Sequence, residues 1–193
     1  MVEKLEKKRI RLSPEDRRAQ LLDVAVQVYG DLGLGKANHS DIAKAAGVST
    51  ATVFNYFPTV EDLNLAVIKY GVKITFEIIE EFFEKGIALE QKPYIVAMAF
   101  KEAIIRNSAL VKLRLSWGGN FNEPYRSQFL KYLSKVEAKF MLYFGDDDRS
   151  VLDAKIIMAL SERLAGHIID GMPDEEVVRL VVRGFEWYNN RPV

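Results

Sequence analysis

The sequence predicts an all-α protein with an N-terminal three-helix head and a larger C-terminal helical bundle. Apolar residues recur every three or four positions along most of the chain, whereas the two-residue alternation typical of strands is scarce. A helix, a tight turn and a second helix are indicated at Asp41–Phe57. The last two helical segments are apolar on more than one face, which is typical of helices that are buried on two sides. We expect the head to cover residues 1–58 and the bundle to cover residues 59–193.

Composition limits the function further. Hydrophobic residues make up 49% of the 193 residues, enough for a sizeable core. The 27 basic and 27 acidic residues are unevenly placed, because residues 1–18 carry a net charge of +3. That surplus lies beside the helix-turn-helix pattern, as expected for nucleic-acid binding. The absence of cysteine excludes thiol chemistry and suits a reducing cytoplasm. No apolar run approaches the ~18 residues of a membrane span, and the N-terminus lacks an apolar signal core, so we expect a cytoplasmic protein.

The first helix is expected to begin at Ser13 and Pro14, as N-cap and first helical residue, and to run to about Leu32. A mixed-charge arm precedes it. Placed before a helix-turn-helix, Arg9 and Arg11 of this arm could enter the minor groove, where narrow A·T tracts concentrate negative potential. A solvated tail without a DNA contact is the alternative interpretation.

The stretch Asp41–Phe57 predicts two short helices joined by a tight turn. Ser40 is expected to cap the first helix, and Gly47 to end it, because glycine adopts the left-handed conformation without steric cost. Ser49 is a suitable N-cap for the second helix. His39 is expected to be a polar residue at the loop–helix junction, with a phosphate contact as the alternative.

The second of these helices has two predicted faces. Residues of the apolar underside are three or four positions apart: Thr50, Val53 and Phe57. The outward face is formed by Thr52, Asn55 and Tyr56, with Ala51 beside them. Asparagine can pair in bidentate fashion with adenine, a threonine methyl can contact a thymine methyl, and a tyrosine hydroxyl can reach phosphate. The residues predicted to contact DNA are Arg9, Arg11, Ser49, Thr50, Ala51, Thr52, Asn55 and Tyr56.

The segment DIAKAAGVSTATVFNYFPTVEDL resembles the DNA-binding signature of TetR-type transcriptional regulators. RIRLSPEDRRAQLLDVAV extends the match, and R-x-R-L-S-P followed by VFNYFPT is similar to the narrower LuxR/HapR/SmcR-type quorum-sensing master regulators. The close match covers Arg9–Leu63. It implies an arm that contacts the minor groove and a homodimer on a pseudo-palindromic operator. Many such regulators carry a phosphate-binding basic residue where this chain has Val60 and Glu61, which puts that contact in doubt.

The bundle is predicted to begin with a long helix capped by Thr59 and Asp62. Its glutamates are interpreted as a solvated face. Further helices follow at about residues 92–104, 108–117 and 124–141, because apolar residues recur there at helical spacing. The aromatic and aliphatic side chains of these helices could line a pocket for an apolar effector, although an ordinary core explains the same pattern. The candidate lining residues are Phe76, Met98, Phe100, Leu113, Trp117, Phe129, Leu133 and Phe140.

The last two predicted helices, Val151–Ile169 and Glu175–Tyr188, are candidates for a subunit interface. The family resemblance implies that this pair forms a four-helix bundle with the same pair of a second subunit. The predicted interface residues are Leu152, Ile156, Leu160, Leu164, Gly166, Val178, Val181 and Phe185. Ile168 is expected to continue the ridge that begins at Leu152. His167 is interpreted as a packed or interface residue, with a ligand contact as the alternative.

The sequence indicates no enzyme chemistry. The two histidines, His39 and His167, are far apart, so no zinc cluster has the usual spacing, and no glycine-rich phosphate loop follows a strand. We expect no metal and no cofactor. The predicted function is a homodimeric DNA-binding transcriptional regulator, of the quorum-sensing type with a possible effector pocket. A local ligand-responsive repressor, a small-molecule sensor and a plain helical interaction module are the alternatives. Activation and repression stay open.

Overall fold

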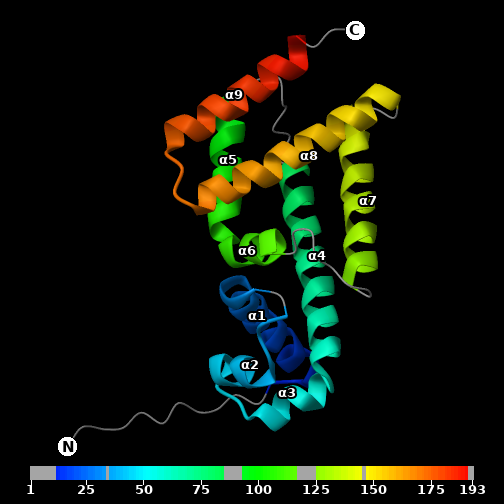
Figure 1. Cartoon of the computed structure of the whole chain (residues 1–193), viewed down its shortest axis with the longest axis vertical. Coiled ribbons are helices and arrows are strands. Elements are labelled where there is room, and N and C mark those ends of the chain that lie inside the picture. The colour runs from blue at the N-terminus through cyan, green and yellow to red at the C-terminus, as the bar shows by residue number, and fades with distance from the viewer. Residues whose placement is uncertain (1–11, 34, 85–92, 117–124, 145–146, 191–193) are drawn as a thin grey trace, which may run out of the picture.

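The computed structural model describes residues 12–33, 35–84, 93–116, 125–144 and 147–190. Within these ranges every regular element is a helix, which confirms the predicted all-α class. Figure 1 shows α1, α2 and α3 together at one end of an elongated molecule and α8 and α9 at the other end. The helices are α1 (Pro14–Leu32), α2 (His39–Ala46), α3 (Thr50–Tyr56), α4 (Val60–Glu84), α5 (Pro93–Arg106), α6 (Ser108–Ser116), α7 (Tyr125–Phe144), α8 (Asp148–Ile169) and α9 (Asp174–Asn190).

Local sequence signals account for most of the helix ends. Ser13 caps α1 by accepting a hydrogen bond from the Asp16 backbone N–H, and Thr59 and Asp62 form the predicted reciprocal cap of α4. The N-cap of α2 is Asn38 and not Ser40, which makes that prediction wrong. The reason is that the Asn38 side chain reaches two backbone N–H groups while the Asp41 carboxylate accepts from the Asn38 N–H. This capping box satisfies more of the helix's unpaired donors than a serine one position later could.

One hydrophobic core joins the three-helix head to the body. It contains residues of α1, α2 and α3, and equally Leu63 and Val67 of α4 and Leu110 and Leu113 of α6. A core shared in this way runs across the predicted boundary at residue 58. Residues 1–58 and 59–193 therefore do not have wholly separate cores. Their division into a DNA-binding part and a bundle stays a prediction.

A close backbone contact across that boundary lies between α1 and α6. A Cβ atom added at Gly30 would lie 2.5 Å from the carbonyl oxygen of Ala109, so only glycine permits this backbone approach. An ion pair between Lys112 and Asp31, at 3.8 Å, spans the same two helices. The head is thus held against α6 as well as by the continuous chain through α4.

A second core lies among α5, α6, α8 and α9, with Ala97, Ala165 and Val177 at its centre. Ile168 is buried in it and does not extend the exposed ridge, so that prediction is wrong. Successive steps of four residues advance about 40° around a helix with 3.6 residues per turn. Over the four steps from Leu152 to Ile168 this drift amounts to about 160°, which turns Ile168 to the opposite face.

Candidate nucleic-acid interface

The turn between α2 and α3 has the geometry that the sequence predicts. Gly47 adopts φ 65° and ψ 35°, the left-handed conformation that ends α2. Ser49 then caps α3, accepting from the Thr52 backbone N–H at 3.1 Å, and its hydroxyl lies 2.8 Å from that of Thr52. These local hydrogen bonds fix where α3 begins and how it leaves the turn.

The underside of α3 is anchored by two fully buried side chains, Val53 and Phe57. The guanidinium carbon of Arg18 in α1 lies 5.2 Å from the centre of the Phe57 ring. His39, the first residue of α2, is only 3% exposed, and its Nε2 lies 2.6 Å from the Phe57 carbonyl oxygen. His39 is therefore a packed residue within the head, and the alternative of a phosphate contact is not supported.

The side of α3 that faces solvent differs from the predicted face. Thr52 and Tyr56 are half-buried, and Tyr56 packs against the first core. Thr50, which the spacing assigns to the apolar underside, is exposed instead. The exposed residues of α3 are Thr50, Ala51, Phe54 and Asn55.

Sequence reasoning did not include Phe54, although 46% of this aromatic side chain is exposed. Its ring stacks on His39 with the ring centroids 4.0 Å apart and the planes 7° from parallel. Phe54 is four positions after Thr50 and three after Ala51, so helical spacing alone groups it with them. That spacing is the signal by which it could have been found.

The face carries no charged side chain, because α3 reads TATVFNY. Exposed basic residues of the head lie on neighbouring segments: Arg18, Lys36 and Lys44. Val60 and Glu61, at the start of α4, are both exposed. Arg9 and Arg11 lie outside the described residues. A neutral reading surface flanked by cations is suited to base edges in the middle and phosphates at the sides.

Two hydrogen bonds, one buried and one partly buried, link the head to the body through Asn64. The Tyr29 hydroxyl of α1 donates to Asn64 Oδ1 in α4 at 2.5 Å, and Asn64 Nδ2 donates to the Tyr125 hydroxyl of α7 at 3.1 Å. Burial of the Tyr29 hydroxyl, with smaller contributions from Tyr125 and Asp41, raises the pKa of Tyr29 far above its usual value. This side chain stays neutral and hydrogen-bonded throughout the physiological pH range.

The predicted pocket residues do not gather in one place within the described part of the body. Leu113 is fully buried in the first core, Phe100 packs on the second, and Phe76 makes an edge-to-face contact with Tyr132 at 5.9 Å. Leu133 is half-buried in α7. Trp117 lies outside the described residues, as do the side chains of Phe129 and Phe140. The effector pocket stays a prediction.

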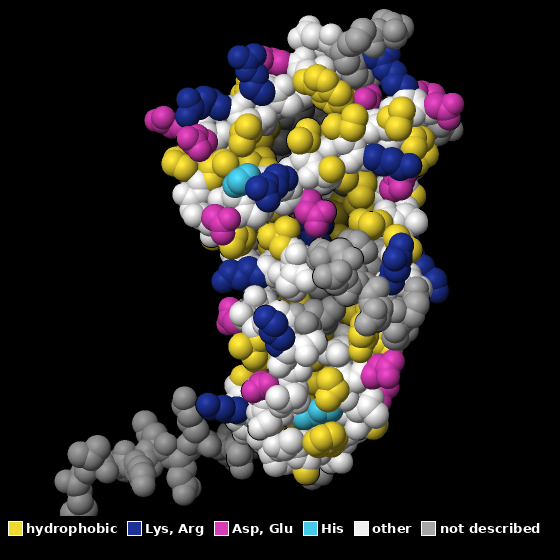
Figure 2. Space-filling view, viewed as in Figure 1, with side chains coloured by type: hydrophobic (Ala, Val, Ile, Leu, Met, Phe, Trp, Pro, Cys, Tyr) yellow, Lys and Arg dark blue, Asp and Glu magenta, His cyan; other side chains and the backbone are white. Residues whose placement is uncertain are grey.

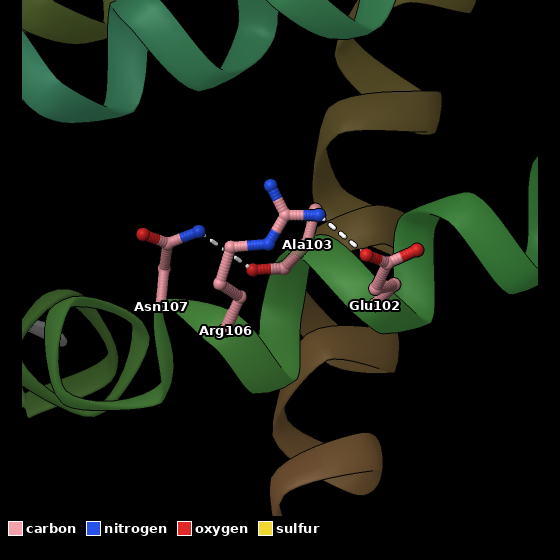
Figure 3. Close-up of polar contacts among 4 residues, drawn as sticks. All are labelled: Glu102, Ala103, Arg106 and Asn107. Atoms are coloured by element: carbon pink, nitrogen blue, oxygen red, sulfur yellow. Dashed lines mark hydrogen bonds and ion pairs between the residues drawn. The ribbon is translucent and has the colours of Figure 1, made fainter.

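Met98 lines a shallow, open hollow on α5, together with Tyr94 and Ile105. The charged side chains of the hollow are already paired. Lys101 forms an ion pair with Asp174 at the start of α9. Figure 3 shows Arg106 donating to Glu102 one turn earlier on α5, at 2.5 Å, while the Asn107 amide donates to the Ala103 carbonyl. The hollow therefore offers mainly apolar surface.

Hydrophobic side chains are gathered on the face of α8 and α9 shown in Figure 2. Of the predicted interface residues, the exposed ones are Leu152 (60%), Ile156 (40%) and Leu160 (55%). Leu164, Val178 and Val181 pack instead on the second core, and a Cβ at Gly166 would face Leu115 of the same chain. The side chain of Phe185 is not described. Leu180 and Trp187, which are not among the predicted interface residues, are also exposed.

The described ranges contain no group of three or more histidines, aspartates and glutamates that could hold a metal ion. In the same ranges, no helix has both the length and the apolar character required to cross a membrane.

The fold and the exposed face of α3 define a class: an all-helical protein with a helix-turn-helix head. Residues 21–67 match the family model of bacterial regulatory proteins of the tetR family. Over these residues the chain resembles the TetR family of bacterial regulatory proteins, and within that family it resembles the LuxR type.

The relatives agree with this assignment. The HTH-type transcriptional regulator LuxR of Vibrio harveyi is 34% identical over 112 residues, which cover 58% of this chain and 55% of that protein. This chain thus spans little more than half the length of that relative. A TetR-like transcriptional regulator from Rhodococcus sp. RHA1 superposes with a TM-score of 0.74 at 15% identity, over 94% of this chain and all of that one.

FadR of Bacillus subtilis, solved in complex with stearoyl-CoA, superposes with a TM-score of 0.66 at 21% identity, over 91% of this chain and 99% of that one. These structural neighbours confirm the predicted TetR-like fold. The matched proteins are regulators, which confirms the prediction that the chain is not an enzyme.

Proposed function

We propose that the chain is a sequence-specific DNA-binding transcriptional regulator that acts as a homodimer. The observation that carries the proposal is the uncharged, solvent-exposed face of α3, held rigidly by two buried side chains and a capped turn. A short helix presented in this way fits the major groove, where its side chains reach base edges. Asn55 is the base-reading residue, because an exposed amide can pair in bidentate fashion with adenine.

The supporting contacts come from the neighbouring segments. We assign phosphate contacts to Ser49, which caps α3, and to Tyr56, the last residue of α3. Thr50, Ala51 and Thr52 line the groove wall in the proposed complex. Arg9 and Arg11 of the N-terminal arm supply minor-groove contacts. Such cationic contacts release counterions and therefore give most of the salt dependence of binding.

The subunits pair through α8 and α9. The exposed leucines and isoleucine of α8 and the exposed Leu180 and Trp187 of α9 form an apolar surface on a single chain. An apolar surface of this kind, on helices already packed on their other side, fits a partner helix pair. Pairing would place two α3 helices on one duplex with two-fold symmetry.

The biological role that we propose first is a quorum-sensing-type global regulator, supported by the 34% identity to LuxR over 112 residues. A local ligand-responsive repressor is the second candidate. The observation in its favour is the structural likeness to FadR, whose structure holds stearoyl-CoA. Sequencing of the genomic fragments that the protein binds separates the two: a global regulator enriches many unlinked promoters, and a local one enriches its own neighbourhood.

The test of DNA reading is a binding-site selection with the wild-type protein and the Asn55→Ala variant. We expect Asn55→Ala to lose discrimination at one operator position by about 1–3 kcal/mol. Asn190→Ala, in α9 and far from the head, is the control and should select the wild-type motif. Arg9→Ala should weaken binding to all sequences and reduce the salt slope by roughly one. An unchanged motif for Asn55→Ala would remove Asn55 from the proposed role.

A further inference from the structure

We propose that Phe54 reads the 5-methyl group of a thymine in the operator, and that His39 is the positioning residue that sets the orientation of Phe54. The proposal rests on the proposed function, because it requires α3 to lie in a major groove. It adds an apolar reading contact to the polar one of Asn55. It also gives a role to the histidine at the start of α2.

Phe54 has the position that such a contact requires. It belongs to the exposed row of α3, between Thr50 one turn earlier and Asn55 next in the chain, and 46% of its side chain is open to solvent. The neighbouring residue Val53 is fully buried, so the exposure of Phe54 follows from the orientation of the helix and not from loose packing. A side chain in this row faces whatever the helix lies against.

His39 holds the ring of Phe54 from the inner side. The Phe57 carbonyl oxygen can only accept a hydrogen bond, so at 2.6 Å the Nε2 of His39 must be the donor. This bond and the position of His39 in the first turn of α2 fix the imidazole, which is 3% exposed. The near-parallel stack at 4.0 Å then covers one face of Phe54 and leaves the rest of the ring outward.

An aromatic ring that is fixed before binding loses little conformational entropy on binding. The two rotatable bonds of Phe54 are restricted by the stack, so we expect the ring to meet the DNA already oriented. A histidine that was free to move could not provide this restriction. His39 is held by the backbone of a buried residue eighteen positions away, which makes it a rigid support.

The chemistry of the ring selects what it can read. Phenylalanine has no hydrogen-bonding atom, so it cannot recognise phosphate or the polar edge of a base. The apolar group that B-DNA presents in the major groove is the C5-methyl group of thymine, with which phenylalanine makes an apolar contact. Because Phe54 adjoins Asn55, we expect this thymine within one or two base pairs of the adenine read by Asn55.

The experiment uses the full chain and an operator duplex obtained by selection. Each thymine of one half-site is replaced in turn by deoxyuridine, which removes only the methyl group. At one thymine we expect the wild-type protein to bind about fourfold more weakly, the factor expected for one buried methyl-sized group. Phe54→Ala should bind the thymine and uracil duplexes equally.

His39→Ala tests the positioning role. It keeps the Phe54 ring and removes its support, so we expect the thymine-to-uracil ratio at that position to fall toward one. Circular dichroism confirms that each variant is folded. Asn55→Ala is the matched control on the same helix, and it should keep the fourfold ratio while losing its own adenine preference.

The outcomes separate the two claims. Failure of the wild-type protein to enrich any sequence would refute the proposed function itself. Specific binding that is indifferent to every thymine-to-uracil replacement would overturn the reading role of Phe54. A thymine-to-uracil affinity ratio that stays about fourfold in the folded His39→Ala protein would overturn the positioning role of His39.

Discussion

At the scale of single residues, the junction between head and body depends on Asn64, which is 5% exposed and hydrogen-bonded on both sides. It accepts from the Tyr29 hydroxyl and donates to the Tyr125 hydroxyl, so its carbonyl and its amide are both used. A buried polar group is costly when its partner is removed, because it then loses hydrogen bonds that water would have supplied. Removing each tyrosine hydroxyl in turn therefore measures how much each of the two hydrogen bonds of Asn64 contributes to stability.

We expect Tyr29→Phe to lower the free energy of unfolding by about 1–3 kcal/mol, because it leaves Asn64 Oδ1 buried without its donor. Tyr125→Phe removes a longer contact in a partly buried site and should cost less. Urea denaturation of the two variants and the wild type measures both effects. Equal stability of Tyr29→Phe and wild type would show that this hydrogen bond contributes nothing.

The raised pKa of a second tyrosine, Tyr70, allows a prediction of how stability depends on pH. Burial raises the pKa of Tyr70 to about 12, and the hydrogen bond that its hydroxyl donates to Asp23 at 2.5 Å adds to the increase. In the unfolded chain a tyrosine titrates near 10. Between about pH 10 and pH 12 the unfolded state therefore loses the proton first, and stability that is fully present below pH 10 is lost as the pH rises.

We expect the melting temperature of the wild type to fall across this pH window. The melting temperature of Tyr70→Phe should fall less steeply, because phenylalanine has no hydroxyl proton to lose. Tyr29, whose pKa is raised in the same direction, should keep a residual slope in that variant. Thermal melts followed by circular dichroism at a series of alkaline pH values measure the slope. Parallel curves of melting temperature against pH for the two proteins would show that Tyr70 does not cause the loss of stability at alkaline pH.

Single residues also show what sequence can predict. The roles of Gly47 and Ser49 follow from their neighbours in the chain, because a helix cap is a local structure. The burial of His39 depends on a carbonyl group eighteen residues away, and no local pattern contains that information. For Phe54, helical spacing gives only the grouping with Thr50 and Ala51, while its exposure and its stacking on His39 depend on how α3 packs against the rest of the head.

At the scale of the elements, α1 and α6 approach so closely that their contact depends on one missing side chain. In most helix interiors, replacing glycine by alanine increases stability by up to about 1 kcal/mol. At Gly30 the sign should reverse, because the new methyl group would lie 2.5 Å from a backbone oxygen that cannot move alone.

We expect Gly30→Ala to destabilise the protein by about 1–3 kcal/mol, the usual cost of overpacking. Gln27→Ala, exposed one turn earlier on α1, is the matched control and should change stability little. Chemical denaturation measures both variants. A Gly30→Ala protein more stable than wild type would mean that α1 and α6 are not in contact in solution.

The helices themselves were largely predictable, because their apolar periodicity is strong and their caps are local. The start of α8 was less predictable: the helix begins at Asp148, three residues before the predicted start, since the apolar pattern begins only at Val151, whereas its end at Ile169 is as predicted. The faces of a long helix were the hardest to assign. A ridge of residues four apart drifts around the axis, which is why Leu152 is exposed and Ile168 is buried.

At the scale of the whole molecule, the proposed dimer predicts that the apolar surface of α8 controls both assembly and DNA affinity. Leu160→Glu should place a charge in that surface and shift the protein toward monomers, because burying an unpaired carboxylate is costly. Leu130→Glu is the matched control, since Leu130 is a half-exposed leucine of α7 outside this surface. Analytical ultracentrifugation measures the assembly state, and we expect only the α8 variant to change it. A dimer that tolerates Leu160→Glu would place the interface elsewhere.

Sequence reasoning could not divide the apolar residues of the body between core, pocket and interface. All three produce the same helical periodicity, and only packing against other helices tells them apart. Leu113 and Leu160 illustrate this, because both are leucines at helical spacing, yet one is fully buried beneath the head and the other is 55% exposed.

The central claim is that two copies of α3, related by the symmetry of a dimer, read one duplex. Selection from a library of random duplexes with the full chain, followed by sequencing of the bound fraction, tests it most directly. We predict an inverted repeat whose half-sites lie about one helical turn apart, roughly 10 base pairs, or a multiple of it. Recovery of no enriched sequence at low salt, or of a single half-site without its inverted copy, would contradict the account.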